Sequence, residues 1–420
     1  MTNLHIQGGT SLSGEVKIGG AKNSILVLMA AALLTNEDVV LHNVPELTDI
    51  DSLSELLTSL GVIIIRQDDT LTINASGLND TSPAQELVSK LRASFFCLGS
   101  LLARFGYVEM PLPGGCSIGM RPVDEHIRGI KLLGADVDIQ HGVVIASTTR
   151  QHLIGARVCF SVPSVGATET LMMASCLCFG ETILENCAMD PEIVDLADLL
   201  NQMGAKVYGA GTPTIRILGV QQLHGTEYTI IPDRIEAGTY LLAGAITRSP
   251  ITVCSVIPQH LNHILIKLQE MGYSINVRDD AISIQTQNSQ YLTPVDIRTA
   301  SYPGFPTDLQ APFLSLLTTI PGVSVVNETI YENRLQHTSE LIKMGANIRT
   351  YNNLAIIQGH SYLTGAKVSG TDLRATAALA LAGLYASGET VISGVEYLER
   401  GYSQFVEKLS HIGAKVWKDS

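Results

Sequence analysis

Cys116 is the residue whose sequence surroundings most clearly favour a reactive side chain. It lies in the segment 111–122, PLPGGCSIGMRP, whose three glycines and three prolines exclude a helix or a central strand. Arg121 follows five residues later, and a thiol near a cation more readily becomes a nucleophile or an acid–base group. The composition is typical of a mobile lid or a rigid turn. The other six cysteines lie mainly in apolar patterns such as MMASCLCFG, and we expect them in the core.

Charged and polar residues also recur at the starts of predicted helices. Helix N-termini attract anions through unpaired N–H groups and the helix dipole. If these helix starts converge, a chain of negative net charge acquires a local cationic pocket for an anionic substrate. The candidates at helix starts are Lys22, Asn23, Arg92, Ser164, Val165, Gly166, Asp233, Arg234, Asp308, Asp372 and Arg374, and Arg121, Arg334 and Arg400 lie outside these starts.

Each candidate also has a purely structural interpretation. Asp233, Thr307 and Thr371 are suitable helix N-caps, and Arg374 is placed to pair with Asp372 across a helix start. For any one residue alone, a cap or a solvated charge is the better interpretation. The joint pattern favours a binding site.

The composition narrows the class of protein. The chain has 420 residues, of which 45% are apolar and 16% charged, enough for two or three domains with sizeable cores. It carries 27 lysines and arginines against 40 aspartates and glutamates, a net charge of −13. This balance disfavours nucleic-acid binding, whose nonspecific affinity comes from neutralising phosphates.

The sequence also carries no sign of secretion or of a membrane span. Its N-terminus lacks the basic and apolar regions of a signal peptide, and the longest apolar stretch, residues 25–34, is about half of a membrane span. Seven cysteines without a C-x-x-C pair are typical of reduced thiols. We therefore expect a cytoplasmic protein without a membrane partner.

Several common catalytic motifs are absent. The sequence has no G-x-x-x-x-G-K-[ST], G-x-G-x-x-G, H-E-x-x-H or G-x-S-x-G, which argues against a P-loop NTPase, a Rossmann dehydrogenase, a zincin and an α/β-hydrolase. It also has no cluster of metal-ligating residues, and we expect no metal.

Six repeats must position the candidate residues. A helical stretch, a glycine and a short strand recur around glycines 61, 134, 204, 272, 345 and 413, which are 68 to 73 residues apart. Each glycine stands where a helix C-terminus favours a left-handed residue. Six copies at this spacing indicate a repeat architecture, which by itself says nothing about chemistry.

The third copy shows the expected unit. We predict strands over 156–160 and 181–185, helices over 165–178 and 191–203, and a closing hairpin of 205–208 with 214–218. The sixth copy ends at Trp417 without its last strand, and residues 4–8 have the missing pattern. We therefore expect one domain over 22–231 and a second over 1–21 and 232–420, completed by the N-terminal strand.

The sequence closely resembles the UDP-N-acetylglucosamine enolpyruvyl transferases of the EPSP synthase-like superfamily. The motifs that carry the resemblance are, in order, GGAKNS, LPGGCSIGMRPVDEH, PSVGATE, PEIVD, PDRIEAGTY, FPTDLQAP, TIYENR, TDLRA and LERGY. The resemblance implies an α/β fold: a two-domain inside-out α/β barrel of six β-α-β-α-β-β repeats, three per domain, which closes on its substrates.

The resemblance also implies the reaction. The 3′-hydroxyl of UDP-N-acetylglucosamine attacks C2 of phosphoenolpyruvate, C3 is protonated, and the tetrahedral phosphoketal loses phosphate to give the enolpyruvyl ether. This is the first committed step of peptidoglycan precursor synthesis. It implies no metal or organic cofactor, and it leaves protein partners open.

Residue roles follow from the resemblance, position by position. Cys116 matches the lid cysteine that fosfomycin modifies, and Asp308 matches the candidate base for the sugar hydroxyl. The phosphoenolpyruvate-binding positions are Lys22, Asn23, Arg121 and Arg400, and Lys22 and Arg400 also count as catalytic. The positions that match contacts with the UDP-sugar are Asn23, Arg92, Arg121, Pro122, Val123, Asp124, Glu125, Ser164, Val165, Gly166, Asp308 and Ile330, and the further cleft positions are Glu192, Asp233, Arg234, Arg334, Asp372 and Arg374.

Two positions depart from some relatives. Val162 stands where some have a lysine that contacts the diphosphate, and Glu125 stands where some have a leucine beside the uracil. These departures put the two individual contacts in doubt.

Three other protein classes compete with this identification. The shikimate-pathway enolpyruvyl transferase shares the six-unit fold, but the PGGC loop and the SVGAT turn disfavour it. A catalytically silent UDP-sugar-binding paralogue would be favoured by the loss of Cys116, Asp308 or Lys22, and all three are present. RNA 3′-phosphate cyclases have a similar unit but are expected to be more basic.

Overall fold

The computed structural model describes residues 2–114, 118–119, 122–148, 152–286, 292–360 and 362–419. These residues form two compact units, each with its own hydrophobic core. The N-terminal unit takes its described residues from 20 to 231. The C-terminal unit takes them from 2 to 19 and from 232 to 419, together with Ile118 and Gly119.

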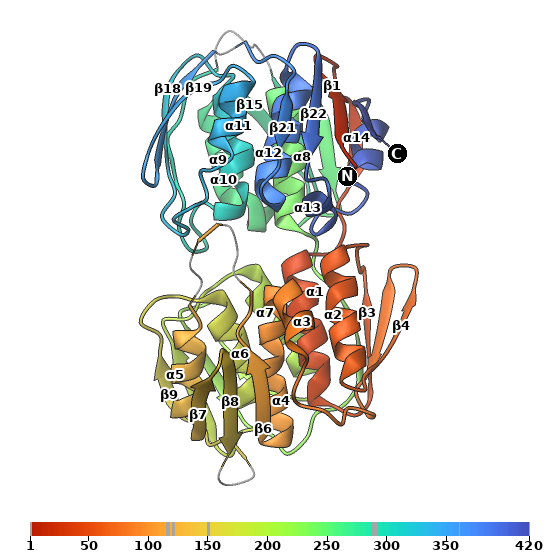
Figure 1. Cartoon of the computed structure of the whole chain (residues 1–420), viewed down its shortest axis with the longest axis vertical. Coiled ribbons are helices and arrows are strands. Elements are labelled where there is room, and N and C mark those ends of the chain that lie inside the picture. The colour runs from red at the N-terminus through yellow and green to blue at the C-terminus, as the bar shows by residue number, and fades with distance from the viewer. Residues whose placement is uncertain are drawn as a thin grey trace. The chain divides into compact units, whose positions relative to one another are not determined.

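Three sheets and seven α-helices are described in the N-terminal unit (Figure 1). In spatial order, the strands of the first sheet are β13 (Thr226–Thr229), β3 (Asp38–His42), β5 (Thr70–Asn74) and β4 (Ile63–Gln67). Those of the second are β6 (Tyr107–Pro111), β8 (Val143–Thr148) and β7 (Ala135–Gln140), and those of the third are β11 (Lys206–Tyr208), β12 (Thr214–Leu218), β10 (Glu181–Glu185) and β9 (Arg157–Cys159). The helices are α1 (Lys22–Ala31), α2 (Thr48–Ser59), α3 (Gln85–Lys90), α4 (Cys97–Phe105), α5 (Asp124–Leu132), α6 (Val165–Ser175) and α7 (Pro191–Gln202), with 3₁₀ turns at Ala32–Leu34 and Arg92–Phe96.

The third repeat confirms the unit predicted from the sequence. Its strands and helices follow in the predicted order, and β9 is parallel to β10 while β12 is antiparallel to both β10 and β11. The first helix, α6, is mostly buried, and apart from Glu169 its residues are apolar or small on all sides. It ends at Ser175, three residues before the predicted end.

The C-terminal unit likewise has three sheets and seven α-helices among its described residues. In spatial order, the strands of its first sheet are β15 (Tyr273–Val277), β16 (Ala281–Thr286), β14 (Ile251–Cys254) and β2 (Gly14–Lys17). Those of the second are β17 (Ile297–Arg298), β18 (Gly322–Asn327), β20 (Leu354–Gly359) and β19 (Asn347–Tyr351). Those of the third are β21 (Lys367–Ser369), β22 (Glu389–Ser393), β1 (Leu4–Gln7) and β23 (Lys415–Lys418). The helices are α8 (Arg234–Ile246), α9 (Asn262–Glu270), α10 (Gln310–Leu317), α11 (Thr338–Lys343), α12 (Leu373–Tyr385), α13 (Glu396–Glu399) and α14 (Phe405–His411), with 3₁₀ turns at Pro258–Leu261 and Thr307–Leu309.

Segments distant in sequence complete three of the sheets. β1 lies between β22 and β23 and is antiparallel to both, in the position that β12 has in the third repeat. β2 runs parallel to β14, and β13 runs parallel to β3. No sequence pattern predicts these last two pairings, since β2 and β13 are four-residue strands outside the repeat phrase.

The repeated glycines have the predicted conformation. All six have φ between 89° and 100°, and each follows the C-cap residue of α2, α5, α7, α9, α11 or α14. This left-handed geometry is accessible to glycine without a Cβ clash, so it ends each helix at a fixed point.

In the C-terminal unit, three buried helices form the centre of the core. α8, α10 and α12 contact one another (Figure 1), and nearly all of their residues are buried. Each is the first helix of its repeat, so the repeat brings three helix starts together. Among the described residues, no helix combines the length and the apolar character that crossing a bilayer requires.

Candidate active site

The starts of α8 and α12 are closed by aspartate side chains. The carboxylate of Asp233 accepts hydrogen bonds from the N–H groups of Ile235 and Glu236, so its predicted role as a cap is confirmed. Asp372 accepts in the same way from Arg374 and Ala375.

The interpretation of Thr371 and Thr307 as helix N-caps is wrong. The cap of α12 is Asp372 rather than Thr371, because the backbone turns helical only after Asp372. The hydroxyl of Thr307 caps no helix, because it donates to Glu328 and accepts from Arg334.

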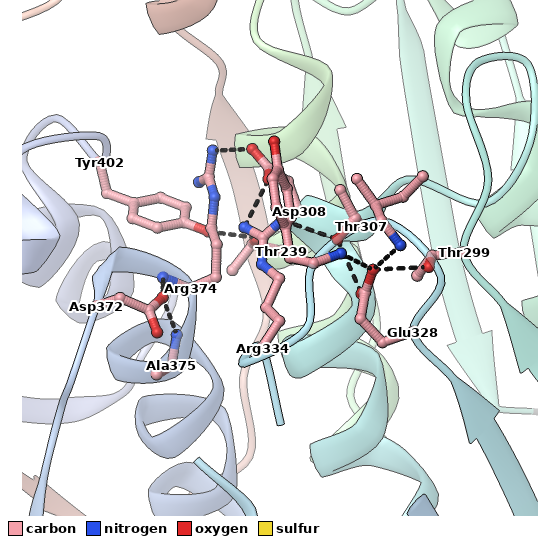
Figure 2. A network of polar contacts seen from close by, with 12 residues as sticks. Thr239, Thr299, Thr307, Asp308, Glu328, Arg334, Asp372, Arg374, Ala375 and Tyr402 are labelled. Atoms are coloured by element: carbon pink, nitrogen blue, oxygen red, sulfur yellow. Dashed lines mark hydrogen bonds and ion pairs between the residues drawn. The ribbon is translucent and has the colours of Figure 1, made fainter. Parts of the chain in front are cut away.

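Asp308 lies between two buried arginines (Figure 2). Its Oδ1 is 2.6 Å from Nη2 of Arg334, and its Oδ2 is 2.8 Å from Nη2 of Arg374. The arginine side chains are 5% and 4% exposed, whereas Asp308 is 24% exposed. The guanidinium of Arg374 therefore pairs with Asp308 and not with Asp372, and the more accessible group of the cluster is the carboxylate.

The electrostatics of this cluster favour charge on all three side chains. Burial raises the pKa of Asp308, but Arg374 and Arg334 outweigh it and hold that pKa well below its ordinary value. Burial lowers the pKa of Arg374, and the negative charge of Asp308 more than reverses this. Asp308 is thus an ionised hydrogen-bond acceptor at neutral pH, and a weak base while both guanidiniums contact it.

Neighbouring side chains hold the two arginines. The guanidinium carbon of Arg374 lies 5.4 Å from the centre of the Tyr402 ring, a cation–π distance, and the Tyr402 hydroxyl is 2.9 Å from Oγ1 of Thr239. Nη1 of Arg334 donates to Thr307 at 2.8 Å. Tyr402, Thr239 and Glu328 were not among the predicted site residues, although Tyr402 lies within the LERGY motif and Thr239 within PDRIEAGTY.

The other predicted positions of the C-terminal unit have separate surroundings. The guanidinium of Arg234 lies 5.4 Å from the ring centre of Tyr302, and Arg400 is the half-buried C-cap residue of α13. Ile330 is 37% exposed, and its N–H donates to Glu328 at 2.8 Å.

In the N-terminal unit, Lys22 and Asn23 begin α1 as predicted. The Nζ atom of Lys22 lies 2.6 Å from Oδ2 of Asp49, near the start of α2, and the two side chains are 12% and 5% exposed. The N-cap residue of α1, Ala21, makes no side-chain hydrogen bond to the start of the helix. An anion that binds Lys22 here has to compete with Asp49.

A second helix start in this unit is formed by Ser164, Val165 and Gly166. The Ser164 hydroxyl caps α6 and accepts from the N–H of Ala167 at 3.3 Å. A Cβ on Gly166 would lie 3.1 Å from Nε2 of His126, which is closer than an ordinary contact, so this approach favours a residue without a side chain. Burial and the nearby charge of Arg92 lower the pKa of His126 to about 4, so it is neutral at pH 7.

The start of α5 carries the remaining predicted contacts. Val123 is its N-cap, Asp124 and Glu125 lie in its first turn, and Pro122 precedes it and is exposed. Oε2 of Glu125 lies 2.5 Å from Nη2 of Arg128. Glu125 is thus already engaged in an ion pair.

Val162 is 60% exposed, and Glu192 is buried in the first turn of α7.

Cys116 and Arg121 lie outside the described residues. Of the six cysteines that are described, Cys97, Cys176, Cys178 and Cys187 are buried as expected, Cys254 is partly buried, and Cys159 is exposed. Within the described ranges, no group of three or more His, Cys, Asp or Glu side chains is arranged to hold a metal ion.

The two units thus offer complementary chemistry. The C-terminal unit presents a fixed carboxylate that is suited to accept a hydrogen bond from a hydroxyl. The two arginines beside it are suited to stabilise developing negative charge. The N-terminal unit presents a lysine and two helix starts, suited to anions.

Comparison with known proteins shows the family. The family model EPSP synthase (3-phosphoshikimate 1-carboxyvinyltransferase) matches residues 6–409. A UDP-N-acetylglucosamine 1-carboxyvinyltransferase of Prochlorococcus marinus (strain MIT 9313) is 53% identical over 416 residues, covering 99% of this chain and 95% of that protein. One from Nostoc sp. (strain PCC 7120 / SAG 25.82 / UTEX 2576) is 52% identical, covering 98% and 93%.

Solved structures agree on the fold. The enolpyruvyl transferase NikO from Streptomyces tendae has a TM-score of 0.89 and 25% identity, and the match covers 99% of this chain and 98% of that one. An EPSP synthase from Acinetobacter baumannii has a TM-score of 0.75 and 18% identity over the whole of both chains, which shows a common fold. The chain belongs to the EPSP synthase family, and within it groups with the relatives named UDP-N-acetylglucosamine 1-carboxyvinyltransferase.

Proposed function

We propose that this chain transfers the enolpyruvyl group of phosphoenolpyruvate to the 3′-hydroxyl of UDP-N-acetylglucosamine and releases phosphate. The observation that carries the proposal is Asp308, held between two buried arginines in a chain whose full-length relatives bear the name of that activity. The substrates carry several negative charges, which suits fixed arginines and helix starts.

The reaction proceeds by addition and elimination. The sugar oxygen bonds to C2 of phosphoenolpyruvate while the double-bond electrons take a proton at C3. The resulting phosphoketal then loses a proton from C3, the double bond re-forms, and the bond between C2 and the phosphate oxygen breaks. The hydroxyl proton must leave the sugar oxygen in the first step, and Asp308 is the acceptor that we assign to it.

The basicity of Asp308 depends on its two arginines. A carboxylate in contact with two guanidiniums is ionised but accepts a proton poorly. A substrate anion that draws Arg374 away would raise the basicity of Asp308, while Arg334 stays in place against it.

The remaining predicted positions bind and orient. Lys22, Arg121 and Arg400 hold the phosphate and carboxylate of phosphoenolpyruvate, and Cys116 acts as the acid–base group of a lid. Asn23, Arg92, Ile330, the segment 121–125 and the turn 164–166 contact the UDP-sugar, and Glu192, Asp233, Arg234 and Asp372 complete the surroundings. No cofactor or metal has a part in this proposal.

The product would be a precursor of peptidoglycan. The proposal therefore includes a cytoplasmic location, a contribution to cell shape and division, and inactivation by fosfomycin at Cys116.

The path of the bridging oxygen tests the mechanism. Phosphoenolpyruvate carrying a heavy-oxygen label between C2 and phosphorus is incubated with enzyme and UDP-N-acetylglucosamine, and both products are analysed by mass spectrometry. We expect the label in the phosphate and an added enolpyruvyl group on the sugar nucleotide. Label retained in pyruvate would show cleavage at phosphorus and contradict the proposal.

A further inference from the structure

Glu328 is a buried carboxylate that binds four hydrogen-bond donors. It directly follows β18 and is 1% exposed. Oε1 accepts from the Thr299 hydroxyl at 2.9 Å and from the N–H groups of Ile330 at 2.8 Å and Tyr331 at 3.2 Å. Oε2 accepts from the Thr307 hydroxyl at 2.8 Å (Figure 2). The four donors satisfy a group that would be costly to bury without partners.

This carboxylate sets the direction of the Thr307 hydroxyl. A hydroxyl has one hydrogen and two lone pairs. Because the hydrogen of Thr307 points to Glu328, a lone pair remains for Nη1 of Arg334, which donates at 2.8 Å. The same guanidinium donates through Nη2 to Asp308 at 2.6 Å. A continuous chain of hydrogen bonds thus connects Glu328 to Asp308.

The other oxygen of Glu328 holds a second part of the site. Its bonds to the N–H groups of Ile330 and Tyr331 fix the turn after β18, and the ring of Tyr331 lies 5.2 Å from the guanidinium carbon of Arg334. One side chain therefore fixes Arg334 through Thr307 and also fixes the turn that packs against it.

We propose that Glu328 is a positioning residue of the active site, which orients Arg334 against Asp308 through the Thr307 hydroxyl. It acts through these residues and touches no substrate. The inference rests on the proposed function for its kinetic consequence, while the geometric link between Glu328 and Arg334 can be tested without turnover.

Glutamine at this position is a selective probe. In Glu328→Gln the amide oxygen can keep Thr299, Ile330 and Tyr331, but the amide nitrogen then faces Thr307 and is itself a donor. The Thr307 hydrogen loses its acceptor, and the bond to Arg334 loses its fixed geometry. A displaced catalytic group slows chemistry more than binding, so we expect kcat to fall about 10- to 100-fold with the KM of both substrates changing less.

Matched variants separate positioning from stability. Glu340→Gln removes another buried carboxylate of the same unit, one that binds Lys343 and the N–H of Ser369, and should leave kcat unchanged. Thr307→Val should reduce kcat as Glu328→Gln does, whereas Thr307→Ser keeps the hydroxyl and should keep most of the wild-type rate. The double variant Glu328→Gln with Thr307→Val should be no slower than the slower single variant. Wild-type kcat in Glu328→Gln, or losses that multiply in the double variant, would overturn the proposal.

An unfolding experiment decides the geometric link even if the chain transfers nothing. Denaturant unfolding of Glu328→Gln, Arg334→Lys and the double variant gives a coupling factor, and we expect at least about threefold in the unfolding constant. The factor should fall when the same cycle is measured with Thr307→Val, because only the contact through the Tyr331 turn then links the two side chains. A factor of one with Thr307 present would refute the link, whereas absent turnover by the wild type would refute only the proposed function.

Discussion

Nη2 of Arg374 lies 2.8 Å from Oδ2 of Asp308, although 66 residues separate the two in the sequence. The contact joins the start of α12 to the 3₁₀ turn that precedes α10, and it follows from the packing of these helices in one core. It places a partly exposed carboxylate against a buried cation.

Replacing Asp308 by asparagine should reduce both turnover and stability. We expect turnover to fall by about 10²- to 10⁴-fold, since the acceptor for the hydroxyl proton is lost. The free energy of unfolding should fall by about 3 kcal/mol, because two buried arginines lose their anion. Steady-state kinetics and denaturant unfolding measure the two effects.

The control for this variant is Asp296→Asn, which alters an exposed carboxylate that accepts from the N–H of Val325. It should keep wild-type turnover and change stability by less than about 0.5 kcal/mol. Full activity in Asp308→Asn would exclude Asp308 as the base. If Asp308 served only as a helix cap, Asp308→Asn would cost only about 1 kcal/mol of stability and leave the rate intact.

The ion pair of Lys22 with Asp49 predicts that Asp49→Asn lowers both the KM for phosphoenolpyruvate and kcat. In Asp49→Asn the substrate anion no longer competes with a carboxylate for Lys22, so the KM for phosphoenolpyruvate should fall about three- to tenfold. The value of kcat should also fall, because the ammonium group loses one of the contacts that hold it in place. Asp51→Asn, on the exposed side of the same helix, is the control, and a KM that rises in Asp49→Asn would contradict this account.

His126 predicts a pH dependence of stability. Its pKa is lowered to about 4 in the folded state against about 6.5 when unfolded, so the unfolded state binds more protons between these values. His126 therefore makes stability rise with pH across this window, by at most about 1.4 kcal/mol per pH unit, and the stability is lost as the pH falls. Unfolding measured at several pH values should show a shallower dependence for His126→Gln, and an unchanged slope would show that His126 titrates normally.

Cys116 should be the thiol that a phosphonate-bearing epoxide alkylates, and the reaction should be faster with UDP-N-acetylglucosamine present. Cys116→Asp should keep transfer activity and resist alkylation, because it retains an ionisable group of similar reach, whereas Cys116→Ala should be slower. Peptide mapping decides between this cysteine and Cys159, the exposed one among the described cysteines. Label on Cys159 with Cys116 untouched would contradict the assignment.

The sequence predicted the elements of the fold better than the contacts of the site. The six glycines and the apolar helices are local signals, so the third repeat has the predicted order of strands and helices. The pairings of β2 and β13 are set by contacts between distant segments, and no local pattern marks them.

The helix starts predicted candidate residues for the chemistry, but not the partners of those residues. Arg374 was expected to pair with its neighbour Asp372, yet it reaches Asp308 in the preceding repeat. For the same reason Glu328 was not assigned and Thr307 was wrongly interpreted as a helix cap, since their roles depend on a hydroxyl that links the 3₁₀ turn at Thr307–Leu309 to the segment after β18.

The choice of acceptor tests the central claim most directly. Phosphate release from phosphoenolpyruvate is measured with purified enzyme and either UDP-N-acetylglucosamine or shikimate 3-phosphate, with Asp308→Asn as the inactive control. We predict release with the sugar nucleotide, equal in amount to the enolpyruvyl ether formed, and none above background with shikimate 3-phosphate. Release with shikimate 3-phosphate, or no release with either acceptor, would contradict the account.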